Sequence, residues 1–335
     1  MAEYSEKEAK VLNRVQQELP LVYMPWHQLA GELGMTPAEV MDVVLSYRQK
    51  GIIRNIAGIF SAEKLGYDIS LVAFSVPDEK VDHAAQIINA NPGVSHNYLR
   101  DHRYNIWFTL AVPPSISLQD EAARMANEAG AADHLLLRNE RMMKLGVKLA
   151  VGGGKVPPAE KSPQDAPRKK GARELTEREK EAVRLLQHDL PADPRPFQRL
   201  IEEYSGALEE DELLDLANGL REDGIMRGFR AVLRHRDAGY TANAMTAWKL
   251  EEGVTLEEVQ KVFGGEPSIS HLYLRTVYPG RWEYPLFAMI HARSDEELQS
   301  IIRRLEEKTG LHQYQVLRSL REFKKERVKY YLSEK

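Results

Sequence analysis

The two halves of the sequence repeat one another, and this duplication limits the folds that the chain can adopt. Ser95–Arg100 reads SHNYLR and Ser270–Arg275 reads SHLYLR. Upstream, YSEKEAKVLNRVQQELP parallels LTEREKEAVRLLQHDLP, and KGIIRNIAGIF parallels DGIMRGFRAVL. Repeats have to be found before a fold is assigned, and here the repeated unit is a two-part domain of about 150 residues.

A segment of unusual composition separates the two copies. Residues 151–174 read VGGGKVPPAEKSPQDAPRKKGARE, with four glycines and four prolines among 24 residues. The segment has almost no large apolar side chains, so burial cannot offset the conformational entropy that ordering would cost. We therefore predict a flexible linker. Each copy is further divided into a helical part and a mixed part. The predicted domains are residues 1–66, 67–150, 175–239 and 240–335.

Local signals predict the fold of each part. Ser5 with Glu8, and Thr36 before Pro37, mark helix starts. Three short helices followed by the strand-like IIRNIAGIF predict a winged helix-turn-helix, meaning three helices and a hairpin. The remainder reads strand, helix, strand, strand, helix, strand, which is the ferredoxin-like order. The fold class is therefore α+β, with two tandem copies of this pair of domains.

Composition excludes several classes of protein. The chain has 335 residues, a net charge of −4 and no cysteine, which excludes disulfides, thiolate metal sites and cysteine nucleophiles. It contains no apolar run of the ~18 residues that span a bilayer, and its charged start is unlike a signal peptide. We therefore expect a cytoplasmic protein with no membrane partner.

A winged helix-turn-helix joined to a ferredoxin-like domain is the plan of leucine-responsive (Lrp/AsnC-type) regulators, so DNA binding is the first hypothesis to weigh. A recognition helix needs Lys and Arg near phosphates. Residues 209–224, which hold the third helix of the second copy, carry seven acids and one base, Arg221. In the first copy Glu39 and Asp42 stand near the helix start, where they also suit the helix dipole. We therefore expect no specific DNA binding.

Each repeated motif places three polar side chains on one face of a strand. Because alternate residues of a strand share a face, His96, Tyr98 and Arg100 point one way. His271, Tyr273 and Arg275 repeat the arrangement. The imidazole can act as an acid, a base or a metal ligand, and the guanidinium can hold a carboxylate. The alternative is an ordinary half-solvated sheet face that common descent copied.

A second group of candidates occurs in one copy only. RGFRAVLRHR contains Arg227, Arg230, Arg234 and His235, whereas the matching RNIAGIFSAE keeps only Arg54. Several arginines on a short strand suit a ligand with many carboxylates, although a basic wing or a solvated hairpin would look the same. His102, Trp107 and Trp282 flank the motifs and could contact a flat ligand, with core packing as the alternative.

The chain resembles the siroheme decarboxylases, which are Lrp/AsnC-like proteins. PGVSHNYLRDHRYNIWFTL looks like the hairpin of that family, and GIMRGFRAVLRHRDAGYTANAM looks like the arginine-rich segment of one of its two subunit types. The resemblance covers nearly all of the chain outside residues 151–174 and implies two homologous subunits fused in one chain. Lrp-like domains pair through their sheets, so an internal pseudo-dimer is expected, while further dimerisation stays open.

The resemblance implies a reaction in which siroheme loses the carboxyl groups of its C12 and C18 acetates, giving 12,18-didecarboxysiroheme for haem or haem d1 synthesis. No cofactor is implied beyond the iron of the substrate. Arginines at Arg54, Arg100, Arg227, Arg230, Arg234 and Arg275 would hold the retained carboxylates, with His102, Trp107, His235 and Trp282 as further substrate contacts.

The chemistry is expected from the two motifs. His96 or His271 would be the general acid, Tyr98 or Tyr273 could protonate the methylene, and one of the two histidines could ligate the substrate iron. Two alternatives stay open: a ligand-responsive transcription regulator, and a haem or siroheme carrier without chemistry.

Overall fold

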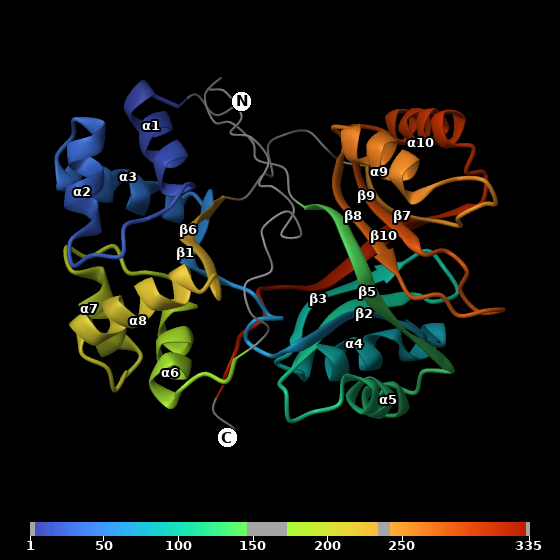
Figure 1. Ribbon diagram of the computed structural model, residues 1–335, viewed down its shortest axis with the longest axis horizontal. Coiled ribbons are helices and arrows are strands. Elements are labelled where there is room, and N and C mark those ends of the chain that lie inside the picture. Colours follow the sequence, from blue (N-terminus) through green and yellow to red (C-terminus); the bar gives the residue numbers. More distant parts are fainter. Residues whose placement is uncertain (1–3, 146–172, 234–241, 333–335) are drawn as a thin grey trace.

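The structure, a computed structural model, describes residues 4–145, 173–233 and 242–332. The predicted linker therefore lies outside the described residues, apart from its last two positions. Figure 1 shows the helix-turn-helix parts of both copies together on one side and a strand-rich body on the other. No helix among the described residues is long and apolar enough to cross a membrane.

Three helices open each copy, and serine or threonine caps begin several of them. Ser5 forms a capping box with Glu8, as the spacing predicts, and Thr36 before Pro37 forms one with Glu39. Thr176 forms the same box in the second copy. The six helices are α1 Glu6–Val15, α2 Pro25–Leu33, α3 Pro37–Gln49, α6 Glu177–Leu186, α7 Pro196–Glu203 and α8 Glu210–Glu222.

The strand after the third helix pairs across the duplication. Strand β1, Ile53–Phe60, and strand β6, Met226–Leu233, form a two-stranded antiparallel sheet. The hairpin expected within each copy is thus replaced by pairing between the copies, because the next strand of the first copy, β2, enters the other sheet. One continuous apolar core then joins both helix-turn-helix parts, from Val11 and Trp26 to Phe197 and Phe229.

The mixed part of each copy confirms the predicted ferredoxin-like order. In the first copy the elements are β2 Asp68–Ser75, the short 3-10 turn η1 Asp78–Lys80, α4 Val81–Ala90, β3 Val94–Arg100, β4 Ile106–Val112, α5 Leu118–Glu128 and β5 Asp133–Leu145. In the second they are β7 Ala242–Trp248, α9 Leu256–Gly265, β8 Ile269–Arg275, β9 Leu286–Ala292, α10 Asp295–Thr309 and β10 Tyr314–Lys325.

The two four-stranded sheets close into one barrel. Its order is β10-β3-β4-β2-β5-β8-β9-β7, and β7 pairs with β10. The last strand of each copy makes the closure, because β5 pairs with β2 on one edge and β8 on the other, and β10 pairs with β7 and β3. Helices α4 and α5 cover the outside of one half, and α9 and α10 that of the other (Figure 1).

Alternation along the strands separates an outer core from an inner one. In β4, Ile106, Phe108 and Leu110 pack beneath the helices, whereas Trp107 belongs to a different cluster inside the barrel. The inner cluster is aromatic and apolar and draws on both copies. Its buried members are Ala73, Tyr104, Trp107, Leu135, Leu137, Ala247, Trp282, Phe287 and Leu317.

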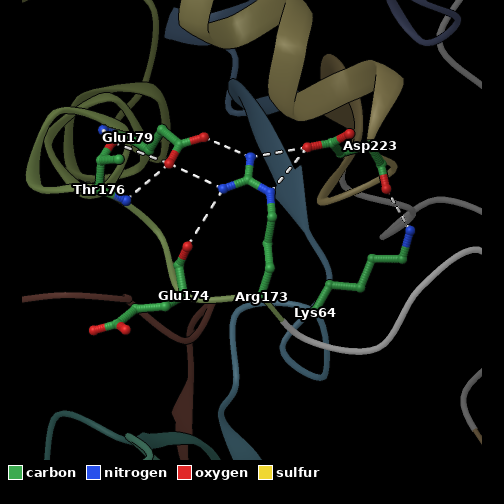
Figure 2. A network of polar contacts seen from close by, with 6 residues as sticks. All are labelled: Lys64, Arg173, Glu174, Thr176, Glu179 and Asp223. Atoms are coloured by element: carbon green, nitrogen blue, oxygen red, sulfur yellow. Dashed lines mark hydrogen bonds and ion pairs between the residues drawn. The ribbon is translucent and has the colours of Figure 1, made fainter.

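An arginine fixes the point at which the second copy begins (Figure 2). Arg173 donates to both carboxylate oxygens of Glu179, at 2.5 and 3.0 Å, and to Asp223 at 2.8 and 3.1 Å. Lys64 of the first copy donates to the backbone oxygen of Asp223. The network therefore connects Arg173, at the start of the second copy, to α6, to the residue that follows α8 and to the first copy.

The pKa of Glu179 falls to about 2, chiefly because Arg173 hydrogen-bonds the carboxylate. A carboxyl group whose pKa is lower in the folded than in the unfolded protein stabilises the fold at pH values above its unfolded pKa. This stabilisation is lost as the pH falls toward the folded pKa. Glu179→Gln keeps the capping box but loses the charge, so we expect a loss of at most about 1 kcal/mol at pH 7. Thermal unfolding should show this gap closing between about pH 4.5 and pH 2; a constant gap would contradict the assignment.

Candidate active site

A cavity of about 680 Å³ opens within the barrel and is lined by both copies. Its volume lies in the range of about 300–1,000 Å³ that is usual for ligand sites. All six side chains of the repeated motifs reach it. These are His96, Tyr98, Arg100, His271, Tyr273 and Arg275. The two motifs are therefore two walls of one site, and barrel closure is what brings them together.

The serine that opens each motif lies at a strand irregularity. The register between β3 and β4 shifts between Val94 and His96, and that between β8 and β9 shifts between Ile269 and His271. Such bulges re-aim side chains. As a result, Ser95 Oγ lies 2.9 Å from His96 Nδ1, and Ser270 Oγ lies 2.7 Å from His271 Nδ1.

Within each motif the three side chains stack along the strand. The ring of His96 stacks on Tyr98 with centroids 6.3 Å apart, and the Arg100 guanidinium lies 5.2 Å from the Tyr98 ring centroid. In the second copy the corresponding separations are 6.2 Å and 4.7 Å. Stacking against the phenol positions both the imidazole and the guanidinium.

The two arginines of the motifs are buried cations without a carboxylate partner among the described residues. Arg100 is 6 % exposed and donates to the backbone oxygen of Leu317 at 2.8 Å. Arg275 donates to that of Leu137 at 3.0 Å, and the Nε atoms of both arginines are buried without a hydrogen bond. Burial lowers the pKa of each guanidinium to about 10. Burying a charge is costly, so this arrangement favours an anionic ligand.

The histidines are held neutral. Burial, followed by the positive charges of His291 and His96, lowers the pKa of His271 to about 4. Burial also lowers the pKa of His96, with smaller effects from Lys325 and Arg54. At pH 7 each imidazole therefore carries one proton and one lone pair and can donate or accept.

The phenols beside them stay protonated. Burial raises the pKa of Tyr273. It also raises the pKa of Tyr98 to about 12, with a smaller contribution from the charge of Glu322. Both tyrosines can therefore donate a hydrogen bond or a proton to a bound ligand.

Arginines of the β1–β6 sheet and of the segment after β10 extend the positive charge beyond the cavity. Arg54 donates to the backbone oxygen of Lys325, whose side chain lines the cavity. Arg327 is half-buried with one Nη atom unpartnered, and burial followed by the charges of Arg54 and Arg230 lowers its pKa. Like charges held close together disfavour one another's charged forms, and a bound anion would relieve that repulsion.

The remaining predicted residues lie at different places relative to the cavity. Trp107 lines the cavity and also belongs to the inner aromatic cluster. His102 and Trp282 do not line it: their rings contact each other 5.4 Å apart within and beside that cluster. Arg227 lies on β6 and hydrogen-bonds Ser61 at 3.4 Å. Arg234 and His235 lie outside the described residues.

Sequence reasoning missed several residues near the site. His291 lines the cavity and hydrogen-bonds Ser270, and no motif in the sequence marks it. Lys325 ends β10, the second-copy strand that pairs with β3 of the first copy, and Arg327 lies in the segment after β10. No local signal identifies them, because strand pairing between the copies decides their position. Among the described residues, no group of three His, Asp or Glu side chains could hold a resident metal ion.

Fold and cavity define the class: a fused pair of AsnC-like modules, each preceded by a helix-turn-helix. An AsnC-like ligand binding domain matches residues 64–144 and 237–324. The siroheme decarboxylase NirDL-like HTH domain matches residues 8–54 and 179–227.

Relatives define the protein more narrowly. A siroheme decarboxylase of Hydrogenobacter thermophilus is 41 % identical over 97 % of this chain and 95 % of its own. The siroheme decarboxylase NirDL subunit of Paracoccus denitrificans is 31 % identical over 88 % of this chain and 87 % of its own. The chain belongs to the siroheme decarboxylase family.

Solved structures agree with this assignment. The crystal structure of the siroheme decarboxylase NirDL matches with a TM-score of 0.77 and 36 % identity, covering 98 % of this chain and 95 % of that one. A second crystal structure, of NirDL in complex with an iron-uroporphyrin III analogue, matches with the same TM-score and coverage at 35 % identity. The fused arrangement predicted from the duplication is thereby confirmed.

The burial of the Arg275 guanidinium leads to a prediction about the free energy of unfolding. Because Arg275 is desolvated without a carboxylate, replacing it by the apolar Met should leave the ligand-free protein within about 1 kcal/mol of wild type or stabilise it. Urea unfolding measures the effect. Arg138→Met, which removes a surface ion pair with Asp68, is the control and should cost at most about 1 kcal/mol. A loss above about 2 kcal/mol in Arg275→Met would mean that the cation serves the fold.

Proposed function

We propose that this chain removes the carboxyl groups of the C12 and C18 acetates of siroheme and yields 12,18-didecarboxysiroheme. The observation that carries the proposal is the pair of buried guanidinium groups, Arg100 and Arg275, that face one cavity together with two neutral imidazoles. Siroheme is flat and aromatic, bears eight carboxylates and contains an iron that accepts an imidazole. Family membership gives the same substrate class.

Arginines hold the carboxylates that are retained. Arg100 and Arg275 would take those that enter the barrel, and Arg54, Arg227 and Arg230 those that lie toward the β1–β6 sheet. A guanidinium binds a carboxylate through two parallel hydrogen bonds. We add Arg327 to this set, because its unpartnered Nη atom lies among the charges of Arg54 and Arg230.

The reacting acetate has different needs. Each step breaks the bond between the methylene and the carboxylate carbon, carbon dioxide leaves, and one proton completes the methyl group. An apolar setting favours loss of the carboxylate charge. Trp107, Phe287 and Leu71 give the cavity such a side. His96 or His271 would act as the general acid, and Tyr98 or Tyr273 could deliver the proton to the methylene.

The iron in this reaction belongs to the substrate, and no further cofactor is part of the proposal. His96 and His271 both line the cavity, so either could meet the iron. Since both motifs share one cavity, we propose one site per chain, built from both copies.

Turnover tests the proposal directly. Anaerobic incubation of the full chain with siroheme, followed by mass analysis, should show loss of two carbon dioxide molecules. His96→Ala and His271→Ala should each slow the reaction by about 100-fold or more, which is the scale of acid–base catalysis. His312→Ala, at an exposed position away from the cavity, is the matched control.

Unchanged siroheme with the wild-type chain would refute the enzyme and leave a carrier. Wild-type rates in both cavity variants would refute the roles of the two histidines. Titration with iron-uroporphyrin should reach one molecule per chain, and two equal sites would contradict the shared cavity.

We also propose that the helix-turn-helix parts do not read DNA. On α8, Glu210 is 4 % exposed and pairs with Arg195, and Glu212 pairs with Arg178. Glu210 is therefore part of the packing between helices, and Glu212 forms a surface ion pair between α8 and α6. Binding to bulk DNA should be weak and vary little with salt; tight binding with a steep salt dependence would restore the regulator hypothesis.

A further inference from the structure

A chain of hydrogen bonds runs from the cavity through the second copy. Ser270 Oγ lies 2.7 Å from His271 Nδ1 and 2.7 Å from His291 Nε2. His291 Nδ1 lies 2.9 Å from Asn243 Oδ1. Asn243 and His291 are directly opposite each other on the paired strands β7 and β9. The proposed reaction gives His291 and Asn243 no role.

Among the described residues, the first copy has the first hydrogen bond of this series and lacks the others. Ser95 Oγ lies 2.9 Å from His96 Nδ1. The strand pair that corresponds to β7–β9 is β2–β4, and there Ile69 faces Ala111 at the positions of Asn243 and His291. Neither side chain can continue a hydrogen-bond chain. The two histidines of the cavity therefore have different support, although their motifs are the same.

The chain of bonds has a direction. Asn243 presents its amide oxygen, which only accepts, so His291 must donate from Nδ1. A neutral imidazole has one N–H, so His291 Nε2 accepts the hydroxyl proton of Ser270. Ser270 Oγ then accepts from Nδ1 of His271, which leaves the Nε2 of His271 with a free lone pair.

The charge state of His291 supports this direction. Burial, followed by the charge of Lys325, lowers its pKa, so the ring is neutral at pH 7. In the first copy, by contrast, Ser95 Oγ hydrogen-bonds only His96 within the described residues. Ser95 can therefore donate to His96 Nδ1 and leave a proton on Nε2.

We propose that Asn243, His291 and Ser270 are positioning residues that hold His271 as the electron-pair donor to the substrate iron and leave His96 as the proton donor. This assignment rests on the proposed decarboxylase function. A histidine that donates its other N–H to a fixed acceptor is the common arrangement around metal-binding imidazoles, where it sets the ring orientation and raises basicity. Duplication supplied two equivalent histidines. The hydrogen-bonded series Asn243–His291–Ser270, called the relay below, is present in one copy and separates their roles.

Histidine tautomers test the relay without any substrate. Nitrogen-15 NMR of the full chain labelled at histidine, with His271→Ala to assign the signal, should show His271 protonated at Nδ1 alone. Asn243→Leu, at an exposed position, should give a mixture of tautomers. A His271 ring protonated at Nε2 in the wild type would overturn the proposal.

Iron binding tests the consequence. Ser270→Ala and His291→Ala should each weaken binding of ferric iron-uroporphyrin about 10-fold and reduce the spectroscopic signal of histidine ligation. Ser95→Ala is the matched control, because it removes the same hydroxyl beside the other histidine, and it should change the affinity by less than about twofold. Thermal unfolding verifies that each variant folds.

The outcomes separate this inference from the function on which it rests. If the histidine-ligation signal disappears in His96→Ala and persists in His271→Ala, the roles are reversed and the inference fails while the enzyme stands. If siroheme is bound by His271 but not decarboxylated, the proposed reaction fails and the relay stands.

Discussion

The last strand of each copy pairs with the sheet of the other copy, and the rest of the molecule depends on this pairing. β5 pairs with β8, and β10 pairs with β3, so neither sheet has a free edge. Unpaired edges invite association with other chains, and closure removes them. The same closure turns the inner faces of the two sheets toward each other. The cavity, its apolar cluster and the meeting of the two motifs all follow from it.

Closure also explains why charge can be placed inside the barrel. Arg100 and Arg275 each donate to a backbone oxygen of a bridging strand, Leu317 on β10 and Leu137 on β5. These bonds fix the guanidinium groups without neutralising them. The unsatisfied charge is a cost in the ligand-free protein, and it is the kind of cost that binding sites carry. Function and stability thus make opposite demands on the same two side chains.

Much of the local structure could be predicted because it depends on neighbouring residues. Thr36 with Glu39 and Thr176 with Glu179 fix helix starts through bonds three residues apart. The strands Val94–Arg100 and Ile269–Arg275 have the bounds that their motifs indicate. The β1–β6 sheet could not be foreseen, since strand propensity does not name a partner. His291 was missed for the same reason: its partners, Ser270 and Asn243, are 21 and 48 positions away in the chain.

The sequence by itself determined the duplication, the ferredoxin-like order of each copy and the strand face that carries His, Tyr and Arg. Periodicity and capping are local, so one chain suffices to read them. The tertiary structure decided that both faces enter one cavity and that Arg54 and Arg327 extend its positive charge. It also decided that, within the described residues, His271 alone of the two motif histidines is connected through Ser270 to a second histidine. These are matters of strand register between copies, and one residue of slippage would turn every such side chain to the other face.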